Sequence, residues 1–179
     1  PFPQDPKNPA NPGLHKPRVT PVSWNVLSVE RVVELVQYWI NQDWPLTPDK
    51  VPRVMAALGW GKAEDGLYEA DLPLNMPCLM ETGDDPVHGL NSVSWNVTDV
   101  VLEGSVERDG FMNDAYTGYV KALGDLWGKP RRLRRKEFVA SHWDVSNGCR
   151  VKVMNDHLSV GVYINSPSYA QVLRNLERR

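Results

Sequence analysis

The stretch from about Asp109 to Ile164 constrains the fold more than any other part of the chain. Its first part predicts a long amphipathic helix, about Asp109 to Trp127, with either Asp109 or Asn113 as its N-cap. Gly128 and Pro130 end this helix, because glycine adopts left-handed geometry and proline cannot continue a helix. Three short segments with alternating apolar residues follow, at 138–143, 149–154 and 158–164. Such a run of strands predicts an antiparallel meander.

Two turn signals separate these three strands. Asn147-Gly148 predicts a primed turn, and Asn155-Asp156 predicts the second turn. In the last strand the apolar and polar residues alternate, so one set faces the core and the other faces out. The inward set is Leu158, Val160, Val162 and Ile164, and the outward set is Ser159, Gly161 and Tyr163.

The first half of the chain predicts two helices and then another group of strands. Ser28 is a suitable N-cap for a Val-rich amphipathic helix that Pro45 ends. Thr47-Pro48 suggests a second helix, which Pro52 either kinks or restarts. Four short segments, 67–72, 76–81, 92–97 and 99–103, carry strand patterns. A final amphipathic helix begins at Ser166-Pro167, and its apolar residues are Tyr169, Val172, Leu173 and Leu176.

We therefore expect an α+β fold in the order arm-α-α-β-α-β-α. Strands occur in groups and do not alternate with helices, which favours an antiparallel sheet with helices packed mainly on one face. Seven of the fifteen prolines lie in residues 1–21, and this predicts an extended arm. Residues 22–179 are expected to form one α+β domain.

Composition excludes several classes of function. A net charge of −2 gives no bulk attraction to nucleic acid or anionic lipid. No apolar run approaches the roughly 18 residues that a membrane span needs. Two distant cysteines, Cys78 and Cys149, make no disulfide framework and fit a cytoplasmic protein. No metal-ligand spacing, phosphate loop or nucleophile motif appears, so we expect no metal, no cofactor and no catalytic residue.

One catalytic alternative remains open, because Cys149 could lie beside His142 or His157 on adjacent strands. A buried structural thiol is the favoured interpretation of Cys149. The paired acids Asp84-Asp85 could serve glycoside chemistry in a cleft, but a solvated turn or an acidic patch explains them more simply.

Three charged segments are candidates for contacting a partner protein. The arm contributes Lys7, His15 and Lys16, and a polar loop at 82–89 contributes Asp84, Asp85 and His88. The third segment is a basic run at 131–136, predicted to be a linker between the long helix and the next strand. It could be simply solvated, or contact a protein, an anion or, least favoured, nucleic acid; its candidate contact residues are Arg131, Arg132 and Arg134.

Several short motifs resemble one known family. They are Ser23-Trp24, Trp44-Pro45-Leu46, Leu58-Gly59-Trp60-Gly61, Gly128-Lys129-Pro130, His142-Trp143 and Leu158-Ser159-Val160. Together they are similar to an actinobacterial immunity-factor family, that of the mycobacterial factor that neutralises tuberculosis necrotizing toxin. The likeness spans about residues 22–177, and its motifs are mostly structural.

This resemblance implies a non-enzymatic cytoplasmic antitoxin. Such a protein binds its cognate toxin domain, here expected to hydrolyse NAD, as a monomer in a one-to-one complex and blocks the active site. We hypothesise that Lys7 or Lys16 occupies the place of the cationic nicotinamide ring, and deletion of residues 1–21 would test this. The alternatives are a chaperone-like or adaptor domain for a secretion substrate, and a small enzyme whose site assembles only in three dimensions.

Overall fold

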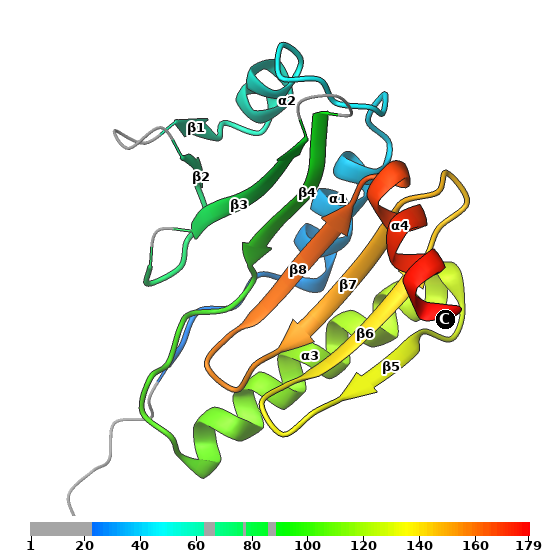
Figure 1. Ribbon diagram of the computed structural model, residues 1–179. Helices are drawn as coiled ribbons and strands as arrows, with labels where there is room; N and C mark the ends of the chain where they lie inside the picture. Colours follow the sequence, from blue (N-terminus) through cyan, green and yellow to red (C-terminus); the bar gives the residue numbers. More distant parts are fainter. Residues whose placement is uncertain (1–22, 63–66, 77, 86–88) are drawn as a thin grey trace, which may run out of the picture.

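The computed structural model describes residues 23–62, 67–76, 78–85 and 89–179, with the backbone alone for 78–85. The elements follow the expected order of helices and strands (Figure 1). The helices are α1 (Val29–Ile40), α2 (Val51–Ala57), α3 (Val106–Trp127) and α4 (Pro167–Glu177). The strands of the first half are β1 (Gly61–Lys62), β2 (Tyr68–Ala70), β3 (Cys78–Asp85) and β4 (Gly89–Asn96). Those of the second half are β5 (Arg131–Arg134), β6 (Val139–Asp144), β7 (Arg150–Asn155) and β8 (Val160–Asn165).

All strand pairs in the described chain are antiparallel, in the order β1-β2-β3-β4-β8-β7-β6-β5. The expected α+β class and the meander β6-β7-β8 are confirmed. The sheet joins the two halves of the chain where β4 pairs with β8, with Trp95 opposite Val162.

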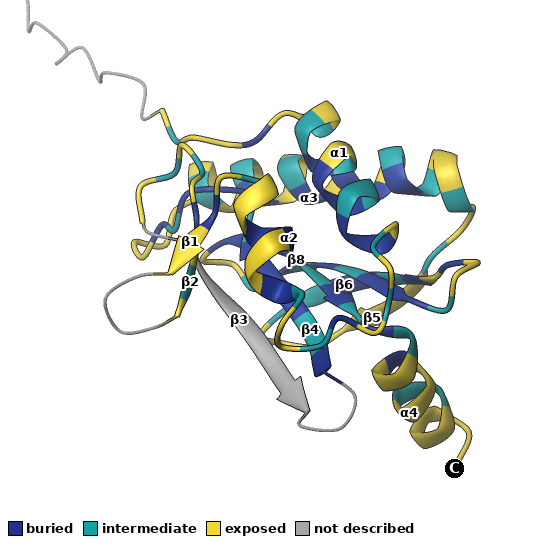
Figure 2. Cartoon of the chain, turned by 90° about the horizontal axis from the view of Figure 1, so that it is seen from above, coloured by how far each residue is buried: buried dark blue, intermediate teal, exposed yellow. Residues whose placement is uncertain are grey.

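Helices α1 and α3 cover one face of the sheet, and α4 lies on the opposite face (Figure 2). The core between α1, α3 and the sheet includes the fully buried Leu35, Trp39 and Leu123. Within it, the Trp60 ring packs against Trp39 and Trp95, with centroids 6.0 and 5.8 Å apart. The helices therefore pack mainly on one face, as expected, and α4 is the exception. None of the described helices is long and apolar enough to cross a membrane.

Helix ends were predicted with mixed success. Ser28 and Ser166 are the N-caps of α1 and α4, as predicted. The predicted cap of the long helix was wrong: Ser105 caps α3, and its Oγ accepts a hydrogen bond from the Arg108 amide at 3.0 Å. The first turn of α3 lies in solvent, with Val106 85% exposed, so apolar periodicity begins only later in the helix.

The second helix begins later than Thr47-Pro48. Residues 48–50 form a turn, and α2 starts at Val51 with Pro52 in its first turn, where the missing N–H costs nothing. Pro52 thus marks the start of this helix, which was one of the two predicted possibilities.

Residues 99–103 form no strand, contrary to the prediction. The side chain of Asp99 is 3% exposed and accepts hydrogen bonds from the backbone amides of Asn25 and Asn75, both at 2.7 Å. These bonds tie three loops together. Leu158, predicted to face inward, lies in the turn before β8 and is 39% exposed.

Candidate protein-binding surface

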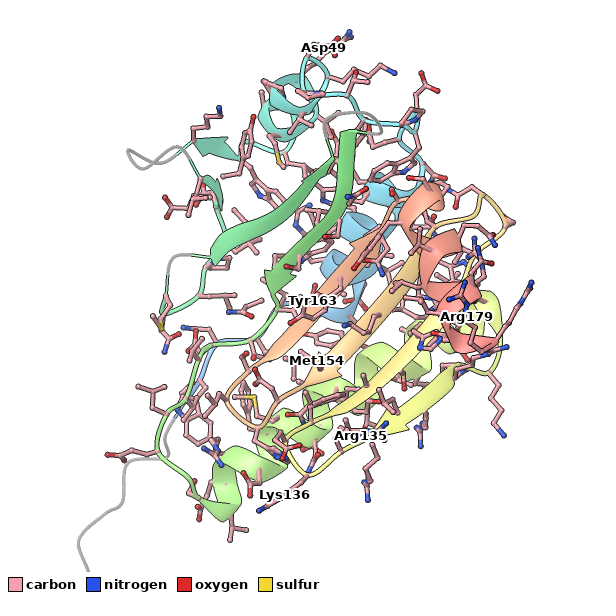
Figure 3. All side chains as sticks on the ribbon, in the orientation of Figure 1. Asp49, Arg135, Lys136, Met154, Tyr163 and Arg179 are labelled. Atoms are coloured by element: carbon pink, nitrogen blue, oxygen red, sulfur yellow. The ribbon has the colours of Figure 1, made fainter. Side chains whose placement is uncertain are left out.

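The sheet face that carries α4 is only partly covered by this helix (Figure 1). Val151 and Val153 are fully buried on the opposite side, so the alternating residues Lys152 and Met154 belong to the face with α4. The strand register places Tyr163 next to Lys152 and Gly161 next to Met154. The open face consists of the partly exposed Lys152, Met154 and Tyr163 and of the buried Ala140 and Gly161 on the same side of the sheet, and Figure 3 labels Met154 and Tyr163 on it.

Lys152 and Tyr163 form the centre of the open face. A Cβ atom at Gly161 would lie 3.3 Å from Cε2 of Tyr163, so the tyrosine ring lies over this glycine. The ammonium of Lys152 is 4.3 Å from the centroid of the same ring, within cation–π distance. Burial, with a smaller contribution from Arg150, lowers the pKa of Lys152. No described carboxylate forms an ion pair with Lys152. A carboxylate of a partner protein can therefore pair with this half-buried ammonium group.

Helix α4 borders the open face with exposed apolar side chains. Tyr169, Val172 and Leu176 are 37%, 51% and 59% exposed. Arg174, on the other flank, contacts Asp144 and the Gly148 carbonyl in the β6–β7 hairpin. Helical spacing places the apolar residues on the flank turned away from this hairpin. We call Tyr169, Val172, Leu173 and Leu176 the apolar flank.

A buried arginine holds α4 on the sheet. Arg150 is 4% exposed and donates to Asp144 at 2.9 and 3.1 Å and to Glu177 at 2.5 and 3.2 Å. Arg174 adds a bond to Asp144 at 3.0 Å. Hydrogen bonds from Arg150 hold the pKa of Glu177 below its usual range. We call these four residues the α4 clamp, and it fixes the helix without burying its apolar flank.

His142 lies on the sheet close to this clamp. Its Nε2 is buried and has no hydrogen-bond partner among the described residues. Burial lowers the pKa of His142, and the charge of Arg150 lowers it further. The imidazole is therefore neutral at pH 7, and its protonation at lower pH is unfavourable in the folded state.

The predicted basic linker is partly a strand. Residues Arg131–Arg134 form β5 at the outer edge of the sheet, paired with β6 so that Arg131 lies opposite His142. The prediction of a linker was wrong because backbone pairing with β6 makes these residues a strand, and this pairing does not depend on their side chains. We call Arg131, Arg132, Arg134, Arg135 and Lys136 the basic edge, and all five residues are exposed. Figure 3 labels Arg135 and Lys136 among them.

Of the three predicted contact segments, the basic run is the one whose side chains lie among the described residues. Arg131, Arg132 and Arg134 lie side by side on β5, and Arg131 reaches Glu177 of α4 at 3.6 Å. Lys7, His15, Lys16 and His88 lie outside the described residues. Asp84 and Asp85 belong to the end of β3, so the predicted loop at 82–89 was wrong for residues 82–85 and for Gly89, which begins β4. Nothing is described of their side chains.

Sequence patterns gave only part of the open face and of the apolar flank. The alternation in β8 predicted that Tyr163 faces out, and the spacing of Tyr169, Val172, Leu173 and Leu176 predicted an amphipathic helix. Neither pattern showed that these two groups would lie beside each other, because that depends on how α4 folds back over the sheet.

Two of the cavities on the described surface lie away from the open face. One, of about 530 Å³, lies near β1 and β2 and includes Lys62, Glu69 and Asp71 in its lining. The other, of about 490 Å³, lies between α1 and α2 and includes Asp49 and Lys50. Both are open to solvent, and their charged groups belong to exposed side chains.

The described residues include no group of three histidine, cysteine or acidic side chains that could hold a metal ion. Cys149 is fully buried, and burial raises the pKa of its thiol to about 12. The strand register places His142 opposite Lys152 rather than Cys149. The thiol is thus protonated at neutral pH and enclosed, which is typical of a structural cysteine.

Comparison with known proteins gives one match. A family model described as a family of unknown function, DUF6301, matches residues 30–166, well over half of the chain. These residues run from α1 through β8 to the N-cap of α4. No curated protein and no solved structure matches the chain significantly.

Proposed function

We propose that this chain, which belongs to the DUF6301 family, is a cytoplasmic immunity protein. It binds a cognate secreted toxin domain one to one and inhibits it by covering the active site of the toxin. The expected toxin activity is hydrolysis of NAD. The apolar flank and the open face form the surface that contacts the toxin.

The observation that carries this proposal is the exposed apolar flank beside the half-buried Lys152–Tyr163 pair. Large apolar side chains gathered on one surface are typical of protein interaction sites. Tyrosine next to such a surface is typical of the anchors that dominate binding energy, and the ammonium of Lys152 over its ring can add an ion pair with a partner. The α4 clamp keeps the surface rigid, which lowers the entropy cost of binding.

The resemblance of the sequence motifs to the actinobacterial immunity-factor family supports the choice of a toxin as the partner. Trp60 and Trp143, two of the motif residues, are almost fully buried, and Gly128 ends α3 with a φ of 82°. The motifs therefore support a common fold, and the antitoxin role follows from that likeness.

Co-expression tests the proposal directly. The chain is produced together with the toxin encoded beside its gene, and growth and NAD hydrolysis are measured. A variant with Val172→Glu and Leu176→Glu places two charges on the apolar flank, and we expect it to lose protection. The matched control carries Leu102→Glu and Val106→Glu, because these residues are 75% and 85% exposed near the start of α3.

We expect the control to protect cells as the wild type does. Equal protection by both variants would remove the apolar flank from the proposal. A complex that forms while NAD hydrolysis continues would favour the adaptor alternative, in which the protein holds a secretion substrate without inhibiting an enzyme.

A further inference from the structure

The outer strand β5 ends the sheet with a row of exposed cations. We infer that the basic edge binds an extended acidic segment of a partner protein, which adds a strand to the sheet beside β5. This inference rests on the proposed protein-binding role, but it does not require that the partner be a toxin.

The backbone of β5 is available for such a strand. It pairs with β6 through four residue pairs, from Arg131 opposite His142 to Arg134 opposite Val139, and among the described residues it is the last strand of the sheet. All four of its residues are exposed. An edge strand leaves backbone N–H and C=O groups directed outward, and these groups can pair with an added strand.

The charges on β5 specify what kind of segment can pair there. The register places Arg131 and Leu133 on the same side of the sheet as His142 and Ala140. Arg132 and Arg134 are on the other side. A strand beside β5 therefore meets arginine on both faces, and acidic residues in that strand would form cross-strand ion pairs.

The basic edge has little counter-charge in the described part of the chain. Arg131 has an ion pair with Glu177, but Arg132, Arg134 and Lys136 form none with any described residue. The whole chain has a net charge of −2, so this local excess of positive charge differs from the rest of the molecule. An acidic segment supplies the missing partners.

Two other occupants fit β5 less well. Charged edge strands protect proteins from pairing with their own copies, and two β5 strands side by side would bring arginines close to arginines. Single-stranded nucleic acid is usually held by aromatic side chains that stack on the bases. The β5 sequence, Arg-Arg-Leu-Arg, contains no aromatic residue. An acidic protein segment satisfies both the backbone and the arginines.

The basic edge is also continuous with the proposed binding surface. The 3.6 Å contact between Arg131 and Glu177 joins β5 to the C-terminal end of α4, where Arg178 and Arg179 add two exposed cations (Figure 3). A partner could therefore pair with β5 and contact the apolar flank with an adjoining surface.

A peptide-binding assay on the full chain tests the inference. The probe is a short fluorescent peptide in which glutamate alternates with threonine, and binding is followed by fluorescence anisotropy. Two further peptides carry N-methyl groups on every second backbone amide, one peptide at the odd positions and the other at the even positions. Only one set faces β5 in an added strand, so we expect one methylated peptide to lose binding and the other to keep it.

Variants supply the second readout. Arg132→Ser with Arg134→Ser should weaken peptide binding at least about tenfold, because two charge-assisted contacts are lost. The control, Arg53→Ser with Lys121→Ser, removes the same charge from α2 and α3 and should bind as the wild type does. Thermal unfolding of both variants checks that they remain folded, which we expect since all four side chains are exposed.

Three results would overturn the inference. They are no binding of the acidic peptide, equal binding of both methylated peptides, and tighter binding of a single-stranded oligonucleotide than of the peptide. No toxin is present in this assay, so its failure would leave the immunity role to be decided by the growth test. Conversely, loss of the immunity role would leave peptide binding unchanged.

Discussion

Helices α1 and α4 are built alike but are used differently. Each begins at a serine N-cap, where Ser28 Oγ accepts a hydrogen bond from the Arg31 amide and Ser166 Oγ accepts one from the Tyr169 amide. Each has an apolar stripe. In α1 this stripe is buried, and the buried residues are Val32, Leu35, Val36, Trp39 and Ile40. In α4 only Ala170 is buried (Figure 2).

The difference shows two ways to hold a helix in place. Helix α1 is stabilised by removing apolar surface from water, so its stripe is unavailable to a partner. Helix α4 is positioned by the ion pairs of the α4 clamp around Arg150, and its stripe remains at the surface. A helix fixed by polar contacts can therefore offer its apolar residues for binding.

The sharpest test of this comparison is a leucine-to-alanine substitution made once in each helix. We expect the larger loss of stability in α1. Leu35→Ala should destabilise the protein by about 3 kcal/mol, because Leu35 is fully buried and its removal leaves a cavity. Chemical denaturation followed by tryptophan fluorescence measures the change. A loss below about 1 kcal/mol would show that α1 does not depend on burial as we describe.

Removal of the clamp should have the next largest effect. Arg150→Met leaves Asp144 and Glu177 without their shared cation, and we expect a loss of about 2 kcal/mol, less than for a wholly buried pair because both acids are partly exposed. Compared with the wild type, this variant should show a larger increase in amide hydrogen exchange in α4 than in α1.

The matched control for Arg150 is Arg31→Met, which breaks the exposed ion pair with Glu34 within α1. Its cost should be below about 0.5 kcal/mol, as for surface pairs in general. Equal costs for the two substitutions would mean that the clamp does not hold α4.

A smaller effect should appear as a dependence on pH. The pKa of His142 is lowered in the folded protein by burial and by Arg150, so the unfolded state binds a proton more readily. His142 thus contributes stability above its unfolded pKa of about 6.5, and this contribution is lost as the pH falls below that value. Urea denaturation in neutral and mildly acidic buffer measures the loss.

The variant His142→Gln isolates this contribution, because glutamine does not titrate. We expect its stability to fall less than that of the wild type between the two buffers. An identical fall in both proteins would assign the pH dependence to other groups.

The smallest effect on stability is expected for the same leucine-to-alanine change in α4. Leu176→Ala should cost less than about 0.5 kcal/mol, since Leu176 is 59% exposed. The same variant should weaken binding to the partner, measured by calorimetry on the co-purified complex. A large loss of stability would show that the apolar flank supports the fold.

Much of the fold could be predicted from the sequence because its signals are local. Ser28, Ser166 and Gly128 mark helix ends through bonds to their own neighbours in the chain. Asn147-Gly148 lies in the β6–β7 hairpin, as predicted, since residues close in sequence form that turn. The predicted primed type was wrong, because such a turn needs a positive φ at its first central residue and Asn147 has none. The start of α3 was missed because its first turn lies in solvent and carries no apolar pattern.

The candidate site could be predicted only in part. Arg131, Arg132 and Arg134 were identified as partner contacts from their charge, but their place in an edge strand was missed. A four-residue strand with three arginines has no alternating pattern, and its conformation depends on pairing with β6. Tyr163 was predicted to face out, while its contact with Lys152 needed the register between β7 and β8.

The sequence by itself determined which residues form stripes and where the chain turns, because periodicity and capping act over a few neighbouring residues. Only the tertiary structure decided that the stripe of α1 is buried and that of α4 exposed. A stripe is buried only when another element lies opposite it, and that depends on parts of the chain far away in sequence.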